Sequence, residues 1–260
     1  MITEPHPVFF DGTTEEPFLC GLMAALEVAV LAVVPIVARG VFLGALTVAV
    51  TDRPERLRPA GELLERLTGV AALAAPAIQN GRLVDKLRHR ASHDGLTGLL
   101  NRVGFRQQID LVLENASTRH EQVGLLFIDL DDFKDVNDLY GHEVGDELLH
   151  QTAERLAAIS RESDAVARLG GDEFAIILAD VNRDDQVRIA AQRFRDAFVE
   201  PFALGDVPIS ISASVGEGIW PDDARTVNAL IKYADAAMYE DKAERKHSGP
   251  RSAHLSSRTG

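Results

Sequence analysis

The sequence contains little cysteine, little basic charge and no long apolar run. Its single cysteine, Cys20, cannot form a disulfide within the chain, so we expect a reducing compartment, the cytoplasm. Acidic residues outnumber basic ones by 40 to 27, and the formal net charge of −13 argues against a protein that binds nucleic acid through its phosphates. A small nucleotide is compatible with this charge, because a metal held by carboxylates reverses the local field.

Membrane insertion is also disfavoured. The most apolar region, residues 22–50, is interrupted by Glu27, Pro35 and Arg39, so its uncharged stretches fall short of the roughly 18 to 20 apolar residues of a spanning helix. The first residues lack the basic segment that begins a signal peptide. We therefore expect a cytoplasmic protein that has no membrane partner.

The 260 residues suffice for two domains with buried cores. Residues 1–76 are rich in alanine, valine and leucine, and β-branched residues on both sides of a turn at Arg39-Gly40 predict strands at 31–37 and 41–50. This part is the expected first domain, and residues 93–247 are the expected second domain.

A predicted helix, residues 58–91, joins the two domains, and Pro76 is expected to kink it. The sequence leaves two interpretations of this helix open. It caps the first domain, or it is a coiled-coil connector that pairs two chains. Residues 77–92 of this helix are the predicted linker between the domains. Its apolar seam consists of Leu64, Leu67, Ala71, Ala74, Ile78, Leu83, Leu87 and Ala91.

The predicted helices and strands of the second domain are typical of an α/β (α+β) protein. The predicted helices are 103–115, 133–139, 144–159, 186–199 and 227–245. The predicted strands are 123–130, 165–169, 174–178 and 209–215. Gly170 and Gly171 tolerate positive φ, so a tight hairpin is expected between the second and third of these strands. The tail, 248–260, is rich in serine, glycine and proline and is predicted to be disordered.

Two acidic clusters lie at strand ends, Asp129-Leu130-Asp131-Asp132 and Asp172-Glu173. If their strands are neighbours in one sheet, Asp129 and Asp172 converge at its edge. Unpaired carboxylates so close together repel each other. A divalent cation with oxygen ligands, such as Mg²⁺, removes that penalty and suits phosphoryl or nucleotidyl transfer. Taken one at a time, however, acids at strand ends are more often ordinary solvated loop residues.

Four motifs over residues 93–246 together resemble the GGDEF family of diguanylate cyclases. The match RLGGDEF, at 168–174, includes the five letters of the family's signature. The other motifs occur in the family's order and spacing and are DGLTGLLNR at 94–102, FIDLDDFK at 127–134 and NDLYGHEVGD at 137–146. The resemblance implies a mainly antiparallel central sheet flanked by helices, as in nucleotidyl cyclases and polymerase palms.

The resemblance also implies a reaction, in which two GTP molecules condense to cyclic di-GMP with loss of two pyrophosphates. Asp129, Asp172 and the carbonyl of Leu130 would hold Mg²⁺, or Mn²⁺ in its place. Glu173 would assist deprotonation of the 3′-hydroxyl, whose pKa the metal lowers. One such domain holds one GTP, so the enzyme would be active only as a homodimer.

The same resemblance implies how GTP is bound. Asn137 and Asp146 would contact the edge of guanine and so select GTP over ATP, and His142 would line the same pocket or pack its loop. The triphosphate would be neutralised by Lys134, which we also count as catalytic, by Lys242, and by backbone N–H groups at a helix start. The remaining implied substrate contacts are Asp132, Phe133, Gly170, Gly171 and Lys246.

An R-x-x-D pair, Arg161 and Asp164, precedes the hairpin. By itself the pair indicates a surface ion pair. At this position it resembles the family's inhibitory product site, in which Arg161 would fork onto cyclic di-GMP with Arg168 assisting. The sequence departs from the family in the last helix, where Arg245 replaces a glycine and Lys246 replaces an arginine. Arginine and lysine are not equivalent at a bidentate phosphate contact.

The first domain has a weaker resemblance. Residues 31–40, 43–48 and 71–80 are similar to the C-terminal half of a GAF sensory domain, so we expect a truncated or degenerate sensor. The sequence leaves two alternatives to a diguanylate cyclase open. One is a non-catalytic GGDEF domain that binds GTP or cyclic di-GMP and acts through partners. The other is a cyclase or polymerase-like palm for another nucleotide, which Asn137 and Asp146 disfavour.

Overall fold

The computed structural model describes residues 6–11, 13, 15, 17–53, 55, 57, 61–181, 185–205 and 207–248. The chain divides into two compact units, residues 1–88 and 89–260. Apart from Ser248, which ends the last helix, the tail predicted to be disordered lies outside the described residues. Across the described ranges, no helix is both long and apolar enough to cross a membrane.

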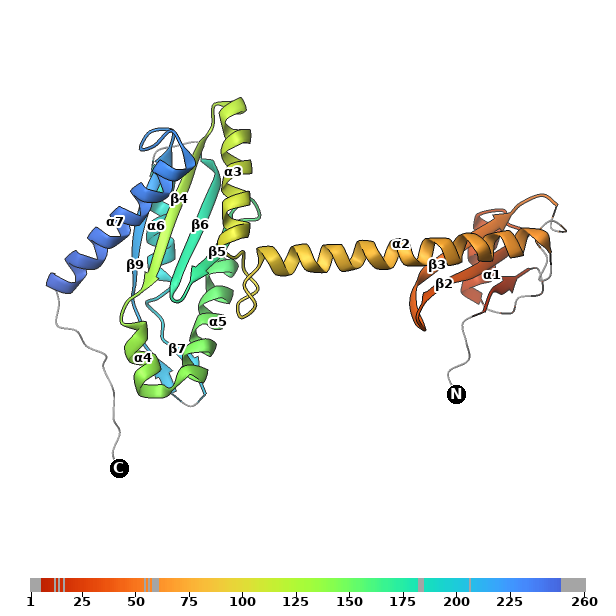
Figure 1. Cartoon of the computed structure of the whole chain (residues 1–260), viewed down its shortest axis with the longest axis horizontal. Coiled ribbons are helices and arrows are strands. Elements are labelled where there is room, and N and C mark those ends of the chain that lie inside the picture. Colours follow the sequence, from red (N-terminus) through yellow and green to blue (C-terminus); the bar gives the residue numbers. More distant parts are fainter. Residues whose placement is uncertain are drawn as a thin grey trace. The chain divides into compact units, whose positions relative to one another are not determined.

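The first unit is built on an antiparallel sheet with the order β1-β2-β3, of which β2 and β3 are labelled in Figure 1. Its described elements are β1 (Val8–Phe10), α1 (Pro17–Ala25), β2 (Val30–Ala38), β3 (Val41–Val50) and most of α2 (Glu62–Ser92). The turn between β2 and β3 uses Arg39 and Gly40, whose φ angles are 50° and 76°. β2 and β3 lie where the sequence predicts strands, whereas β1 and α1 are not predicted.

The first half of α2 packs on this sheet. Leu64, Ala71 and Ala75 are buried against Val34 and Ile36 of β2. Part of the predicted apolar seam therefore covers the helix's own unit. The helix continues past Pro76 to its end at Ser92.

The second unit contains an antiparallel sheet with the order β5-β6-β4-β9. Its strands are β4 (Gln122–Leu130), β5 (Ala165–Gly170), β6 (Glu173–Val181) and β9 (Ala213–Trp220). A separate ribbon pairs β7 (Phe202–Leu204) with β8 (Val207–Ile209). The helices are α3 (Arg102–Arg119), α4 (Phe133–Tyr140), α5 (His142–Ile159), α6 (Asp185–Asp196) and α7 (Val227–Ser248).

Helices cover both faces of this sheet (Figure 1). On one face, α5 and α6 bury Leu148, Leu156 and Phe194. On the other face, α3 and α7 bury Ile109 and Leu230. The predicted fold class, a mainly antiparallel sheet flanked by helices, is confirmed.

One predicted strand, 209–215, has the wrong bounds, because β8 ends at Ile209 and β9 begins at Ala213 and runs to Trp220. Glycine has low strand propensity, so the pattern that contains Gly216 and Gly218 does not predict the part of β9 beyond residue 215. A Cβ on Gly216 would lie 2.1 Å from the backbone nitrogen of Met238. Glycine is thus needed there for α7 to pack directly on β9.

Candidate active site

The two acidic clusters meet at one end of the four-stranded sheet. β4 and β6 are antiparallel neighbours, and Asp129 lies opposite Glu173 in their register. The backbone N–H of Leu130 donates to the carbonyl oxygen of Asp172 at 3.3 Å. The structure therefore brings together the residues to which the sequence analysis assigns metal binding and proton transfer.

The hairpin between β5 and β6 is built on its two glycines. Gly170 and Gly171 have φ angles of 146° and 55°, which residues with a Cβ rarely adopt. Arg168 holds the hairpin in place, since its Nε donates to the carbonyl of Gly171 and its Nη1 to the carboxylate of Asp94, both at 3.0 Å. This guanidinium is engaged within its own domain, and its part in a product site stays a prediction.

Asp94 opens the first motif of the domain. Its carboxylate also accepts from the backbone N–H and the hydroxyl of Thr97, at 2.9 and 2.7 Å. Burial raises the pKa of Asp94, but these hydrogen bonds and Arg168 outweigh it, so the pKa lies below its ordinary value. Asn101 of the same motif caps α3 and donates to the carbonyl of Ala91 in α2. The motif thus ties α2, α3 and the hairpin together.

Asp129 is almost buried, with 8% of its surface exposed. Lys242 of α7 donates a hydrogen bond from Nζ to its Oδ1. Burial raises the pKa of Asp129, Lys242 opposes this, and the charges of Asp172 and Asp131 add to the increase, so the pKa lies above its ordinary value. Burial lowers the pKa of Lys242, but its bond to Asp129 and the neighbouring carboxylates outweigh burial and raise it. Lys242 therefore compensates only part of the negative charge here.

Glu173 is more open, and its side chain is 43% exposed. Arg102, the first residue of α3, places its Nη2 3.7 Å from the Oε2 of Glu173. Burial raises the pKa of Glu173, Arg102 opposes this, and the charges of Asp129, Asp172 and Asp235 add to the increase. The pKa therefore lies above its ordinary value, which suits a group that accepts a proton. The sequence alone indicates no role for Arg102, although this residue closes the first motif.

Asp131 has different contacts from Asp129. Its carboxylate accepts from the hydroxyls of Ser212 and Ser214 at 2.6 and 2.7 Å, and its N–H donates to the carbonyl of Ser212 at 2.9 Å. These bonds fix the chain after β4 to the start of β9. Asp132 then adopts a positive φ of 58° and begins α4 directly after the acidic cluster.

The oxygen groups at this sheet end are of the kind that magnesium prefers. The carboxylates of Asp129 and Asp172 and the carbonyl of Leu130 are hard oxygen ligands. A divalent cation would relieve the repulsion that contributes to the raised pKa of Asp129. In the part of the chain that the structure describes, no group of three His, Cys, Asp or Glu side chains could hold a metal. Backbone oxygens, water or substrate phosphates would have to complete the shell, as Mg²⁺ commonly requires.

Asn137 and Asp146 lie on the two helices that follow the acidic cluster. A Cβ on Gly145 would lie 2.0 Å from the Oδ1 of Asn137, so glycine makes room for this amide next to Asp146. Asp146 and His142, the first residue of α5, are exposed. The residues predicted to contact guanine therefore belong to one junction, between α4 and α5.

The other predicted phosphate and backbone contacts lie on α4 and α7. Phe133 is buried in the core and anchors the start of α4, while Lys134 beside it is exposed. Lys246 lies one turn beyond Lys242 on α7 and is exposed. The arginine that replaces glycine, Arg245, donates from Nε to Asp241 at 3.2 Å.

Arg161 and Asp164 are joined locally by a hydrogen bond from the Arg161 N–H to the Asp164 Oδ2, 2.9 Å long. Arg161 is exposed, whereas the Asp164 side chain is only 2% exposed. The Nη2 of Arg193, on α6, lies 3.7 Å from the Asp164 carboxylate. The sequence pattern does not indicate that Arg193 pairs with Asp164, because this contact depends on how α6 packs.

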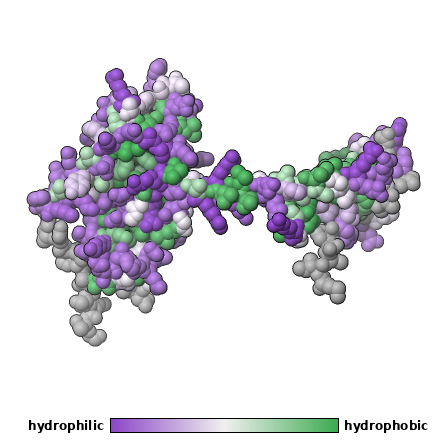
Figure 2. Space-filling model, viewed as in Figure 1, coloured by the Kyte–Doolittle hydropathy of each residue, from purple (hydrophilic) through white to green (hydrophobic). Residues whose placement is uncertain are grey.

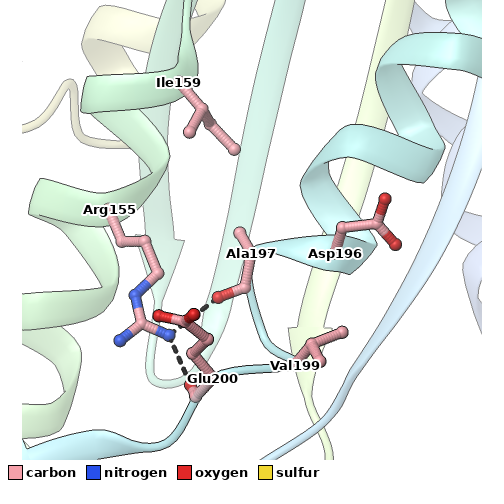
Figure 3. Close-up of a pocket in the computed structure, with 6 residues that line it drawn as sticks. All are labelled: Arg155, Ile159, Asp196, Ala197, Val199 and Glu200. Carbon is pink, nitrogen blue, oxygen red and sulfur yellow. Dashed lines mark hydrogen bonds between the residues drawn. The ribbon is translucent and has the colours of Figure 1, made fainter.

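A depression of about 510 Å³ lies apart from these residues and is lined by Arg155, Ile159, Asp196, Ala197, Val199 and Glu200 (Figure 3). The Nη1 of Arg155 donates to the carbonyls of Ala197 and Glu200, each at 2.7 Å. Its guanidinium also lies 3.7 Å above the ring of Phe202. Arg155 thus stabilises the chain that follows α6, and we assign this depression no chemistry.

Residues 91–248 match the family described as "Diguanylate cyclase, GGDEF domain". Two curated proteins of Pseudomonas aeruginosa are similar to this chain. "Diguanylate cyclase TpbB" is 43% identical over 164 residues, which cover 62% of this chain and 38% of the relative. "Cyclic di-GMP phosphodiesterase NbdA" is 41% identical over 157 residues, which cover 60% of this chain and 20% of the relative.

A solved structure is similar to the same part of the chain. It is a variant of PA1120 (TpbB or YfiN) from Pseudomonas aeruginosa comprising only the GGDEF domain, with a TM-score of 0.57 and 40% identity. The match covers 58% of this chain and 89% of that one. The chain thus spans nearly all of this isolated domain but well under half of either curated relative.

Proposed function

Because the chain belongs to the GGDEF family of diguanylate cyclases, we propose that it condenses two molecules of GTP into cyclic di-GMP and releases two pyrophosphates. One observation carries this proposal, the register of β4 and β6 that sets Asp129 opposite Glu173 at the end of the sheet. A metal-binding carboxylate and a proton acceptor so arranged can act on the same hydroxyl.

Both new bonds form by the same chemistry. The 3′-oxygen of one GTP attacks the α-phosphorus of the other, and the bond from that phosphorus to the departing pyrophosphate breaks. Glu173 accepts the proton of the 3′-hydroxyl, and its raised pKa supports this role. Bound Mg²⁺, or Mn²⁺, would supply Lewis acidity, and Asp129, Asp172 and the carbonyl of Leu130 would hold it.

Asn137 and Asp146 give the site its preference for guanine. A carboxylate accepts from the N1 and N2 donors of guanine, and an amide contacts its O6 or N3. Adenine lacks this donor pattern. The room that Gly145 leaves for the Asn137 amide supports the pairing. His142, exposed at the start of α5, lines the same pocket.

In this proposal the triphosphate is held by backbone N–H groups of α4 and by lysines of α4 and α7. The backbone N–H groups of residues 132–134 begin α4 beside the acidic cluster. Lys134 and Lys242 supply positive charge from α4 and α7. A Cβ on Gly170 or Gly171 would meet nothing within 4 Å, so the hairpin leaves open space for the nucleotide against its backbone.

Each GGDEF domain binds one GTP in this scheme, so the reaction requires two domains that face each other, and we infer a homodimer. Exposed residues of α2 with heptad spacing support pairing with a second copy. We call this set the α2 stripe, and it consists of Val70, Leu73, Ala77, Asn80, Val84 and Leu87. Figure 2 shows hydrophobic side chains on the surface of this helix. The stripe shares only Leu87 with the predicted seam, whose Leu64 and Ala71 pack on β2.

Product inhibition at the R-x-x-D site is also part of the proposal. Arg161 is exposed and would fork onto a phosphate of cyclic di-GMP, while Asp164 is held beside Arg193. Binding there would slow the enzyme as its product accumulates.

The rest of the chain would carry the input. We infer that residues 1–76 belong to a sensory domain of the GAF type and that residues 77–92 link it to the cyclase domain. The strands β2 and β3 and the packing of α2 on them support this interpretation.

Incubation of the purified protein with GTP and Mg²⁺, with the product identified by chromatography and mass spectrometry, tests the function. Cyclic di-GMP from GTP, and no cyclic dinucleotide from ATP, is the expected result. The alternative is a non-catalytic module that binds GTP or cyclic di-GMP. Two departures from the family pattern favour this alternative. Arg245, which contacts Asp241, stands in place of a glycine, and Lys246 stands in place of an arginine. Binding of GTP without product would support this alternative.

A further inference from the structure

Lys242 of α7 forms an ion pair with Asp129. Its Nζ donates to the Asp129 Oδ1, and the two side chains are only 23% and 11% exposed. Two neighbouring acids have other partners, since Asp131 accepts from two serine hydroxyls and Glu173 faces Arg102. The hydrogen bond of the Lys242 ammonium goes to Asp129, a carboxylate to which we assign metal binding.

An ammonium and a divalent cation cannot share this carboxylate without strong repulsion. The Asp129 side chain is nearly enclosed, so water screens the two positive charges poorly. We therefore expect a metal ion on Asp129 to weaken or displace the contact that Lys242 makes with Oδ1.

The displaced ammonium has a second partner once a nucleotide is present. Lysine is a compact charge on a flexible stem with three donors, and a triphosphate offers it several oxygens. The backbone of α7 is packed closely on β9 at Met238, one turn before Lys242. A Cβ on Gly216 of β9 would lie 2.1 Å from the backbone nitrogen of Met238. The exchange of partners is therefore a movement of the Lys242 side chain and not of the helix.

We propose that Lys242 is the resting counter-ion of Asp129 and that it couples metal binding to nucleotide binding. It opposes the metal when the site holds no nucleotide, and it turns to the triphosphate when metal and nucleotide enter together. Such coupling is reciprocal, so the nucleotide strengthens metal binding by the same factor as the metal strengthens nucleotide binding. The inference rests on the proposed function, because it takes Asp129 as a metal ligand and a triphosphate as the substrate.

Titration with Mn²⁺ in the absence of nucleotide, followed by the electron paramagnetic resonance of the free ion, tests this coupling without any turnover. Lys242→Met keeps most of the stem and removes the charge. Lys232→Met is a matched control, because Lys232 is an exposed lysine on the same helix. Lys242→Met should bind Mn²⁺ at least about fivefold more tightly than the wild type and the control, the lower end of common coupling factors. The double variant Lys242→Met/Asp129→Asn should lose this gain.

A second titration measures the coupling itself. 3′-Deoxy-GTP lacks the attacking hydroxyl, and its affinity is measured calorimetrically with Mn²⁺ and with EDTA. The ratio of the two affinities should be smaller in Lys242→Met than in the wild type or Lys232→Met.

Three results would overturn the inference. The first is Mn²⁺ binding by Lys242→Met that is no tighter than that of the wild type. The second is a gain in Mn²⁺ affinity that persists in the double variant with Asp129→Asn, because the ion would then bind at a site without Asp129. Failure of every variant to bind Mn²⁺ even with 3′-deoxy-GTP would overturn the proposed function as well. In contrast, the predicted gain in a protein that forms no cyclic di-GMP would support the coupling and refute only the catalytic activity.

Discussion

Asp129 on β4 lies opposite Glu173 on β6, and each of these carboxylates pairs with a cation from a different helix. Lys242 of α7 bonds to Asp129, and Arg102 of α3 lies 3.7 Å from Glu173. Burial still raises the pKa of both acids. Two carboxylates that their own cations do not fully neutralise form a site that favours a further positive charge.

Asp146 is expected to decide between guanine and adenine. Asp146→Ala should reduce the preference for GTP over ATP by about ten- to a hundredfold, because a hydrogen bond to a charged group contributes about 1.5–3 kcal/mol. Asp138→Ala is the control, since Asp138 is exposed on α4 and loses the same charge. Competition of the two nucleotides for binding measures the preference. An equal loss in both variants would mean that Asp146 acts only through net charge.

The α2 stripe is expected to hold two chains together. Leu73→Glu with Leu87→Glu should shift the protein to monomers in sedimentation experiments, because charges would replace two apolar residues of the stripe. The control is Ala72→Glu with Lys86→Gln, which lowers the net charge by the same amount at exposed positions outside the stripe. Wild-type association in the stripe variant would exclude this surface as the interface.

Arg161 is expected to bind the product. Arg161→Ala should raise the cyclic di-GMP concentration needed for half-inhibition by about tenfold or more, since a charge-assisted bond to phosphate is lost. Arg188→Ala is a suitable control, because Arg188 is an exposed arginine on α6. Inhibition curves of the initial rate give the comparison. A curve for Arg161→Ala that matches the wild type would count against the site.

Asp94 is expected to contribute pH-dependent stability. Its pKa lies below the ordinary value of 3.8, because hydrogen bonds from Thr97 and Arg168 outweigh the effect of burial. Its contribution is therefore fully present above that value and is lost as the pH falls through the lower folded-state pKa. Asp94→Asn should lower the free energy of unfolding by about 1–3 kcal/mol near neutral pH.

Urea unfolding of the wild type and Asp94→Asn, at neutral pH and in steps below pH 4, checks this prediction. The difference between the two proteins should shrink in acid. A difference that is the same at every pH would show that the Asp94 charge does not stabilise the fold. Asp138→Asn, an exposed position, should show little difference at any pH.

Much of the site follows from local pattern. The apolar run before Asp129 predicts β4, and the paired glycines predict the hairpin that carries Asp172 and Glu173. The prediction that these acids meet depends on the two strands being neighbours in one sheet, which the pairing of β4 with β6 confirms.

The partners of these acids do not follow from the sequence in the same way. Lys242 reaches Asp129 from α7, and Arg102 reaches Glu173 from α3, because both helices pack on one face of the sheet. The packing of α7 depends on the close approach of Met238 to Gly216 of β9. In the sequence pattern this glycine only interrupts a predicted strand. Distant ion pairs of this kind require the three-dimensional arrangement.

The most direct test of the proposed reaction is the initial rate of cyclic di-GMP formation from GTP in the wild type and in Glu173→Gln, measured across pH. Glutamine keeps the size of the side chain but cannot accept the proton. The wild-type rate should rise with pH through the raised pKa of Glu173, since only the ionised carboxylate is a base. The variant should bind GTP yet turn over at least about a hundredfold more slowly, the lower range for loss of a general base. Wild-type turnover by Glu173→Gln would contradict the account.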